Sequence, residues 1–232
     1  MSAGTKVWLS THGGVVDPER ATISIFDRGF LYGDSVYETM RTANGRVVEL
    51  EAHLRRLHRS AAGIAFEVPF SDEQMSTAIA ETLAAAQNRE SRLRLVVTRG
   101  TGPIALDTRE AEGPVLAVIV TPLQLLPAEI YERGISAVIV SDNEGTFRPG
   151  LKTGNYLGHI LALHQAHEAG AEDAILLNND GAVAEGSTSN LFMVIDRSVH
   201  TPSLATGVLA GITRELVIGL LDREIDAPVC ER

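Results

Sequence analysis

The stretch PLQLLPAEIYER, residues 122–133, places the strongest constraint on the fold of this chain. It contains two prolines within a sequence that is otherwise rich in strand-like runs, and proline cannot donate a ladder hydrogen bond inside a sheet. Such a stretch is typical of a connection between domains. We predict an N-terminal small domain over residues 1–121, an interdomain linker over 122–133 and a C-terminal domain over 134–232.

The N-terminal domain is predicted to mix strands and helices. The dipeptide NG at 44–45 indicates a hairpin turn between two of its strand-like runs. Ser71 is a typical helix N-cap, and acidic residues follow it in the first turn. Alternating or β-branched residues predict strands at 21–26, 35–42, 46–50, 92–100 and 114–123, and apolar periodicity predicts helices at 51–64 and 71–87.

The C-terminal domain is predicted to be mixed as well. Strand-like runs lie at 134–142, 173–178 and 183–196, and a helix is expected at 155–170, with Gly170 as its stop signal. Residues 206–221 indicate a glycine-rich loop that enters an apolar helix. The expected fold class is therefore α+β, or mixed α/β, in two lobes.

Composition excludes several classes of function. The 232 residues carry a formal net charge of −10, whereas nucleic-acid binding needs clustered cations, so no nucleic-acid partner is expected. We find no signal sequence and no run of roughly 18 apolar residues, so we expect a cytoplasmic protein without a membrane partner. The single cysteine, Cys230, excludes an internal disulfide and a thiolate zinc site. The spacing in HQAHE, 164–168, does not match the usual zinc helices, so no metal is predicted.

Lys152 is unusual because the chain has 18 arginines and only one other lysine, Lys6. A lone lysine is most often a solvated surface charge. Arginine, however, stays protonated above about pH 12, whereas a desolvated lysine can lose its proton and attack a carbonyl to form an imine. The flanking Gly150 and Gly154 permit close approach of backbone or ligand. Lys152 is therefore a candidate nucleophile.

Other segments fit a lysine that binds pyridoxal 5′-phosphate (PLP), which needs a carboxylate at its ring nitrogen and a phosphate site. Glu185 ends a predicted strand among small residues, although such a glutamate is often only a surface charge. AGITREL, 210–216, begins a helix whose first N–H groups could bind an anion or be capped by Thr213. Arg56 could bind phosphate with its guanidinium, or lie at the surface.

These residues belong to motifs that resemble the fold-type IV, or class IV, PLP-dependent aminotransferases. That family includes branched-chain transaminases, D-amino acid transaminases and aminodeoxychorismate lyases. The resemblance covers nearly the whole chain and implies an α+β, two-lobed fold like that of D-amino acid aminotransferase, assembled as a homodimer. It rests on DRGFLYGDSVYETMR (27–41), HLRRLHRSA (53–61), GLKTGNYL (150–157), AILLNNDGAVAEGSTSNLF (174–192) and GVLAGITRELV (207–217).

The resemblance also implies roles for individual residues. Lys152 would hold the cofactor as a Schiff base and shuttle the proton between the substrate Cα and the cofactor, and Glu185 would pair with the ring nitrogen. The phosphate would be bound by Arg56, Gly211, Ile212 and Thr213. The ring and its surroundings would be contacted by Leu209, Tyr156, Ser187 and Thr188.

The substrate-binding residues do not match a single branch of the family. VVTRGTGPIALD, 96–107, resembles D-amino acid transaminases up to TRGT, but Ile104 and Leu106 stand where that branch has its carboxylate-binding arginine and histidine. GPIALD resembles some branched-chain enzymes, although Thr39 replaces their glycine. Arg28 is the first candidate for binding a substrate carboxylate, unless loop carbonyls bind it instead. The further substrate-binding candidates are Tyr37, Thr39, Arg41 and Arg99.

We therefore predict a PLP-dependent transaminase that moves an amino group between an amino acid and a 2-oxo acid by ping-pong chemistry. A D-amino acid transaminase of an atypical kind is the first expectation. A branched-chain L-amino acid transaminase and an aminodeoxychorismate lyase are the enzymatic alternatives, and a binding domain that has lost the chemistry is the non-enzymatic one. Family members continue beyond the GITR helix, so the C-terminal domain is expected to be incomplete.

Overall fold

The computed structural model describes residues 4–141, 150–225 and 229–232. The chain divides into two compact units. Unit 1 holds the residues up to Leu125 together with Lys152–Gly154, and unit 2 holds Leu126–Leu151 and Asn155–Arg232. The predicted C-terminal range 134–232 had included Lys152–Gly154, but these residues pair with a strand of unit 1 and therefore group with it.

Most of the predicted linker is structured. Pro122 is the last residue of β6 (Val115–Pro122), and α4 (Ala128–Arg133) occupies the C-terminal part of the stretch. Pro127 is the N-cap residue of α4, where its missing N–H deprives the helix of no hydrogen bond, and Gly134 follows the helix with a φ of 72°. One proline thus marks the end of a strand, and the other precedes the first residue of a helix.

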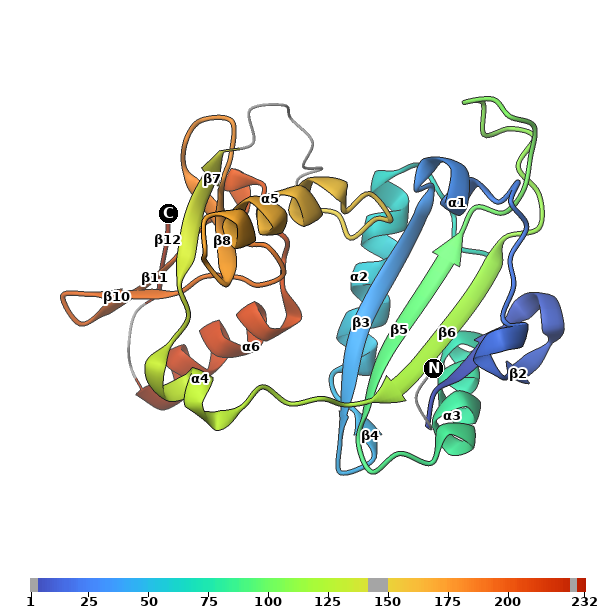
Figure 1. The fold of residues 1–232 in the computed structure, drawn as a ribbon, viewed down its shortest axis with the longest axis horizontal. Helices are drawn as coiled ribbons and strands as arrows, with labels where there is room; N and C mark the ends of the chain where they lie inside the picture. The colour runs from blue at the N-terminus through green and yellow to red at the C-terminus, as the bar shows by residue number, and fades with distance from the viewer. Residues whose placement is uncertain (1–3, 142–149, 226–228) are drawn as a thin grey trace. The chain divides into compact units, whose positions relative to one another are not determined.

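Unit 1 is built on a six-stranded sheet in the order β2-β1-β6-β5-β3-β4 (Figure 1). Its neighbouring strands are antiparallel throughout. The runs predicted at 35–42, 92–100 and 114–123 form its three longest strands. The bounds are β1 (Lys6–Leu9), β2 (Gly14–Val16), β3 (Ser35–Ala43), β4 (Arg46–Val47) and β5 (Ser91–Thr98), with β6 as given above.

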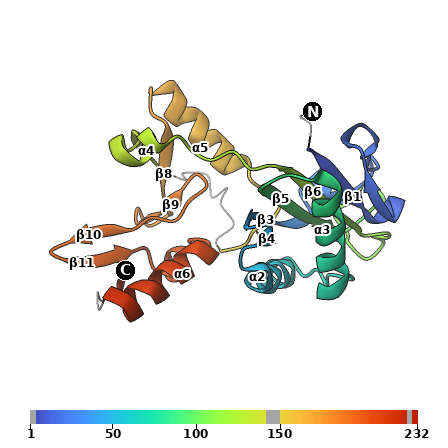
Figure 2. The same ribbon diagram turned by 90° about the horizontal axis from the view of Figure 1, so that it is seen from below.

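Two helices, α2 (Leu50–Gly63) and α3 (Asp72–Ala86), cover one face of this sheet (Figure 2). Their apolar residues pack with side chains of β3, β5 and β6 into the main core of unit 1. A capping box between Ser71 and Gln74 begins α3 and satisfies two backbone N–H groups. Both helices match their predicted bounds to within one residue.

The other face of β3 and β5 is polar, because successive side chains of a strand alternate between the two faces. Val36, Met40, Leu93 and Leu95 are buried in the main core. The alternate residues of the two strands point the other way, with Thr39 opposite Arg94 and Arg41 opposite Arg92 in the strand register. We call this the arginine face: Tyr37, Thr39, Arg41, Arg92 and Arg94.

One predicted strand is wrong, and another is shorter than predicted. ATISIF, 21–26, is not a strand: Ser24 Oγ accepts the N–H of Phe26 at 3.1 Å in a turn, and Asp27 then caps α1 (Arg28–Tyr32). RVVEL, 46–50, is a strand only at Arg46–Val47, because α2 already begins at Leu50. Local turn and helix signals here outweigh the strand propensity of the β-branched residues.

Unit 2 contains two three-stranded sheets. In the first, β8 pairs with β7 in parallel and with β9 in antiparallel fashion, and small residues of α5, Ala162 and Ala166, pack in its core. The elements of unit 2 besides α4 are β7 (Ala137–Ser141), α5 (Leu157–Glu168), β8 (Asp173–Leu177), β9 (Val183–Gly186), β10 (Met193–Ile195), β11 (Ser198–Thr201), α6 (Ile212–Leu220) and β12 (Val229–Glu231). Short helical turns occur at Ser10–His12, Pro18–Arg20, Leu204–Thr206 and Leu221–Ile225.

Candidate active site

The backbone of Lys152 is fixed against β3 and α2. The Lys152 carbonyl oxygen accepts the N–H of Tyr37 at 3.1 Å, and the Lys152 N–H donates to Ser60 Oγ at 3.0 Å. Gly154 donates its N–H to the carbonyl oxygen of Ser35 at 2.9 Å. A Cβ on Gly154 would overlap Ser35 Oγ and lie 3.0 Å from the carbonyl oxygen of Gly33, so a glycine allows this close approach.

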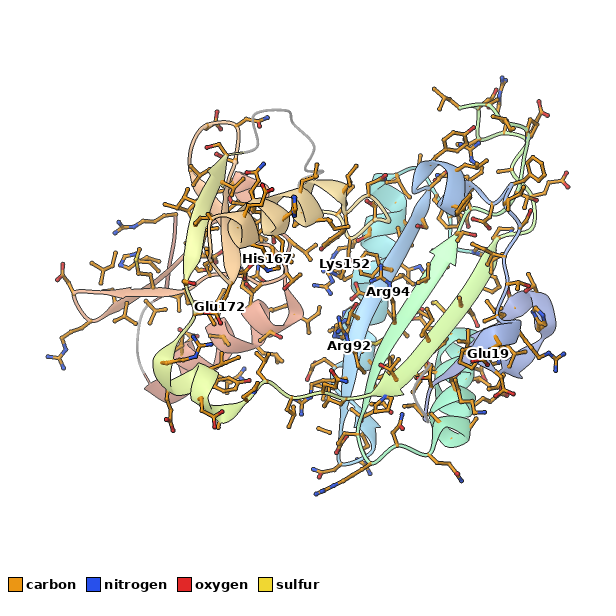
Figure 3. All side chains as sticks on the ribbon, in the orientation of Figure 1. Glu19, Arg92, Arg94, Lys152, His167 and Glu172 are labelled. Carbon is orange, nitrogen blue, oxygen red and sulfur yellow. The ribbon has the colours of Figure 1, made fainter. Side chains whose placement is uncertain are left out.

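The side chain of Lys152 lies beside an aromatic ring on the arginine face. Its Nζ is 4.6 Å from the centroid of the Tyr37 ring, and the guanidinium carbon of Arg94 is 3.8 Å from the same centroid. Both are within the range of cation–π attraction. Figure 3 labels Lys152 together with Arg92 and Arg94. The Lys152 amine thus shares the Tyr37 ring with a second cation, the Arg94 guanidinium.

Arg92 and Arg94 were not among the predicted site residues. Both are exposed, and neither forms an ion pair within the part of the chain that the structure describes. The alternation R-L-R-L at 92–95 was a usable signal, since it places both arginines on the face opposite Leu93 and Leu95. The predicted candidates Thr39 and Arg41 lie on the same face, with Thr39 half-buried and Arg41 exposed.

Arg28 and Arg99, two predicted substrate-binding cations, are held by groups of the protein itself. Arg28, only 3% exposed, donates to Asp34 Oδ2 at 2.9 Å and to the carbonyl oxygens of residues 105–107. Arg99 donates to the same Asp34 oxygen at 2.8 Å and to the carbonyl oxygens of residues 64 and 65. Arg28 therefore makes the loop-carbonyl bonds that the sequence had left as its alternative.

Arg56, the predicted phosphate ligand on α2, pairs with a buried acid. Its Nε donates to Glu38 Oε1 at 2.8 Å and its Nη2 donates to Oε2, so both carboxylate oxygens bind one edge of the guanidinium. His53 Nδ1 lies 2.7 Å from Glu38 Oε2. Glu38 was not predicted, although it occupies a core-facing position of β3 between Val36 and Met40.

The ionisation of Glu38 reflects two opposing effects. Burial by itself raises the pKa of Glu38, because it disfavours the charged carboxylate. The hydrogen bonds from Arg56 and His53 outweigh burial and hold the pKa of Glu38 below its ordinary value of 4.5. Glu38 is therefore ionised at neutral pH, and it keeps the guanidinium of Arg56 in a fixed orientation.

Glu185, the predicted partner of a ring nitrogen, lies on β9 in unit 2. Its Oε2 accepts the backbone N–H of Leu209 at 3.3 Å, and its Oε1 is 3.5 Å from His159 Nε2. His159 stacks on Tyr156 with ring centroids 4.4 Å apart. Three predicted cofactor-binding residues, Tyr156, Glu185 and Leu209, thus belong to one chain of contacts within unit 2.

The segment before α6 is held close to the same residues. Asn190 donates its side-chain N–H to the Leu209 carbonyl oxygen at 3.0 Å. A Cβ on Gly211 would overlap the Asn190 side chain, so glycine at this N-cap position of α6 allows the present packing and offers no capping side chain. Ile212 is buried and Thr213 exposed at the helix start, where N–H groups favour an anion.

Ser187 and Thr188, expected to border the site, follow β9 directly. Ser187 is 3% exposed, and its hydroxyl donates to Asp173 Oδ1 on the neighbouring strand β8. Thr188 is exposed. Ser187 therefore holds the strand end in place, while Thr188 has its side chain at the surface of unit 2.

The two histidines of HQAHE, 164–168, lie in the last turns of α5, where His164 contacts a glutamate on the same helix. His164 Nε2 lies 3.5 Å from Glu168 Oε1, and both side chains are exposed. Within residues 4–141, 150–225 and 229–232, we find no cluster of three or more His, Cys, Asp or Glu side chains placed to hold a metal ion. The same described ranges contain no helix with the length and apolar character needed to cross a membrane.

Comparisons with a family model and with known relatives point to the same family. Residues 35–231 match the family described as "Amino-transferase class IV". A relative from Methanocaldococcus jannaschii, named "Putative branched-chain-amino-acid aminotransferase", is 38% identical over 222 residues, which cover 94% of this chain and 75% of that protein. A D-alanine aminotransferase from Bacillus licheniformis is 33% identical over 211 residues, which cover 91% of this chain and 74% of that protein.

Solved structures agree with this assignment. The branched-chain aminotransferase from Thermoproteus uzoniensis, solved with norvaline, superposes with a TM-score of 0.85 at 32% identity, covering 98% of this chain and 77% of that one. The T.th. branched-chain amino acid aminotransferase, solved with pyridoxamine 5′-phosphate, gives a TM-score of 0.88 at 29% identity, covering 100% and 77% respectively.

The chain belongs to the class IV aminotransferases, and its α+β fold is the fold type IV of that family. Class IV aminotransferases use PLP, as the resemblance had implied. The described residues suit this cofactor: unit 1 offers an amine on a fixed backbone at Lys152, and unit 2 offers the Glu185 carboxylate and the glycine-led start of α6.

Proposed function

We propose that this chain transaminates branched-chain L-amino acids, passing the amino group to a 2-oxo acid in a ping-pong reaction, and that it acts as a homodimer. The similarity to the Methanocaldococcus jannaschii relative supports this substrate class, because its 38% identity exceeds the 33% of the D-alanine aminotransferase. The first candidate for a substrate-carboxylate ligand in the D-amino acid expectation was Arg28, whose guanidinium already binds Asp34 and the carbonyl oxygens of residues 105–107.

We assign the central chemical role to Lys152. Its amine would hold the cofactor covalently and, when free, would accept the proton from the substrate Cα as a general base. When bound, PLP withdraws electrons from that carbon and so makes the proton acidic enough to remove. The contacts of the Lys152 backbone with Tyr37 and Ser60 support this role, because they fix the point from which the amine extends.

The remaining cofactor contacts divide by chemistry. We propose that Glu185 pairs with the ring nitrogen, that Tyr156 lies near the phenolic oxygen and that Leu209 packs against the ring. The phosphate is assigned to a guanidinium and a helix N-terminus, both suited to anions. Its proposed ligands are Arg56, Gly211, Ile212 and Thr213.

For the substrate carboxylate we propose the arginine face in place of Arg28. Arg94 is the first candidate, since its guanidinium lies over the same Tyr37 ring as the Lys152 amine. Arg41 on β3 and Arg92 on β5 are partners in the strand register. Like charges at directly opposed positions destabilise strand pairing. A bound carboxylate would offset this repulsion.

Replacing Arg94 by leucine is expected to raise KM for the amino acid and the 2-oxo acid by about 10- to 100-fold. A charge-assisted hydrogen bond contributes roughly 1.5–3 kcal/mol, which corresponds to this range. The PLP content should stay unchanged. The control is Arg46→Leu, which removes an exposed arginine of β4. Unchanged KM values in the Arg94 variant, or loss of its PLP, would show that the assignment is wrong.

A half-reaction screen tests the proposed function. The PLP-loaded protein is mixed with one amino acid at a time, and its visible absorption is followed as the cofactor converts to the amine form. L-leucine, L-isoleucine and L-valine should convert it fastest. Faster conversion by D-alanine would restore the D-amino acid hypothesis. Release of pyruvate from aminodeoxychorismate, without conversion by amino acids, would support the lyase alternative.

A further inference from the structure

His159 connects two of the proposed cofactor ligands in unit 2. Its Nε2 is 3.5 Å from Glu185 Oε1, and the two side chains are only 14% and 17% exposed. This distance is longer than a typical N–H···O hydrogen bond. The imidazole also stacks on Tyr156, with 4.4 Å between ring centroids and 21° between planes.

The contacts of His159 and Leu209 together restrict the carboxylate of Glu185. Leu209 donates its backbone N–H to Oε2 at 3.3 Å, while His159 lies beside Oε1. A carboxylate that has a partner on each oxygen cannot rotate without losing one of them. Each oxygen has two lone pairs, so Glu185 can still accept a hydrogen bond from a ligand.

We propose that His159 is a positioning residue for the ring nitrogen of the cofactor. It acts through Glu185, which it holds in the orientation that accepts a hydrogen bond from the protonated ring nitrogen. Its stacking on Tyr156 fixes the plane of the imidazole and thereby the direction of its Nε2. The inference rests on the proposed function, because it requires Glu185 to pair with that nitrogen.

Helix α5 provides a matched control for this inference. His164 also places its Nε2 3.5 Å from a glutamate oxygen, that of Glu168, but these two side chains are 65% and 69% exposed. An exposed pair of this kind contributes little, because water screens it. The two histidines thus share a helix and a contact distance, and they differ in burial and in the residue that they contact.

The test compares two ligands of the cofactor-free protein: PLP, and the PLP analogue in which a C–H group replaces the ring nitrogen. His159→Leu should weaken PLP binding roughly tenfold, as loss of an outer partner does at other ligand sites, and should barely affect the analogue. His159→Gln retains a hydrogen-bond donor and should recover part of the loss. His164→Leu should change neither affinity.

Equal losses for both ligands would mean that His159 only supports the fold, and an unchanged PLP affinity would also overturn the inference. If the leucine variant does not fold, His159→Asn, whose shorter side chain retracts from Glu185, must show the same selective loss. A wild-type protein that binds both ligands equally and still transaminates would contradict the inference alone. A wild-type protein that takes up PLP but does not transaminate would instead contradict the proposed function.

Discussion

The Lys152→Ala variant is expected to lose its covalently held cofactor and about 10⁴-fold in transamination rate, the upper range for loss of a positioned general base. The chain has only one other lysine, so no neighbouring lysine can replace Lys152. Its backbone is fixed by hydrogen bonds to Tyr37 and Ser60. The measurement is borohydride reduction followed by mass analysis of the lysine peptides. In the wild type, the label should appear on the peptide that contains Lys152.

The other lysine supplies the control. Lys6 lies on β1 and forms an ion pair with Asp17 at 2.6 Å, so Lys6→Ala should leave cofactor and rate unchanged. Lys152→Arg keeps the positive charge but cannot form the imine, because a guanidinium stays protonated, and it should therefore be as inactive as the alanine variant. A fully functional Lys152→Arg protein would favour the hypothesis of a binding domain that has lost its chemistry.

The parts of the fold that could be predicted from the sequence are those in which local pattern and tertiary packing agree. In β5, the alternation of arginine and leucine at 92–95 matches one buried and one exposed face, and in α3 the Ser71 capping box coincides with the helix start. In ATISIF, 21–26, the same kind of propensity failed. The Ser24 turn and the Asp27 cap are local hydrogen bonds that strand propensity does not report.

The site residues show a similar division. Lys152 could be singled out because lysine is rare in this chain. Glu185 could be singled out because it lies in a motif that resembles one of a known family. The carbonyl partners of Arg28 could not be predicted, since they lie 77 to 79 positions away in the sequence. Any residue type has a carbonyl oxygen, so sequence contains no signal for such a bond. The alternation at 92–95 indicates that Arg92 and Arg94 share a face, but only the register of β3 and β5 places Thr39 and Arg41 opposite them.

Replacing Glu38 by alanine is expected to destabilise the protein by about 3–5 kcal/mol, because it removes the carboxylate of a buried ion pair. Glu38 is fully buried and Arg56 is 6% exposed, so water cannot replace the lost hydrogen bonds. Urea denaturation followed by circular dichroism measures the loss. The control is Glu51→Ala, since Glu51 and Arg55 form an exposed pair on α2 at 4.0 Å and should contribute little.

The same pair makes stability depend on pH in a defined direction. Because the pKa of Glu38 is lower in the folded protein than its ordinary 4.5, the unfolded chain binds the proton more tightly. The contribution of Glu38 is therefore fully present above that value and is lost as the pH falls through the folded-state pKa. Glu38→Gln should be less stable at neutral pH, and its stability should fall less steeply in acid than that of the wild type.

A double variant separates the structural role of this pair from its proposed role in phosphate binding. Replacing a buried ion pair by apolar residues of similar size is often neutral for stability, so Glu38→Leu with Arg56→Met should recover most of the loss seen in Glu38→Ala. If Arg56 binds the phosphate, the double variant should still bind PLP more weakly than the wild type, while its affinity for pyridoxal, which has no phosphate, changes little. A double variant that regains both stability and PLP affinity would mean that Arg56 serves only the core of unit 1.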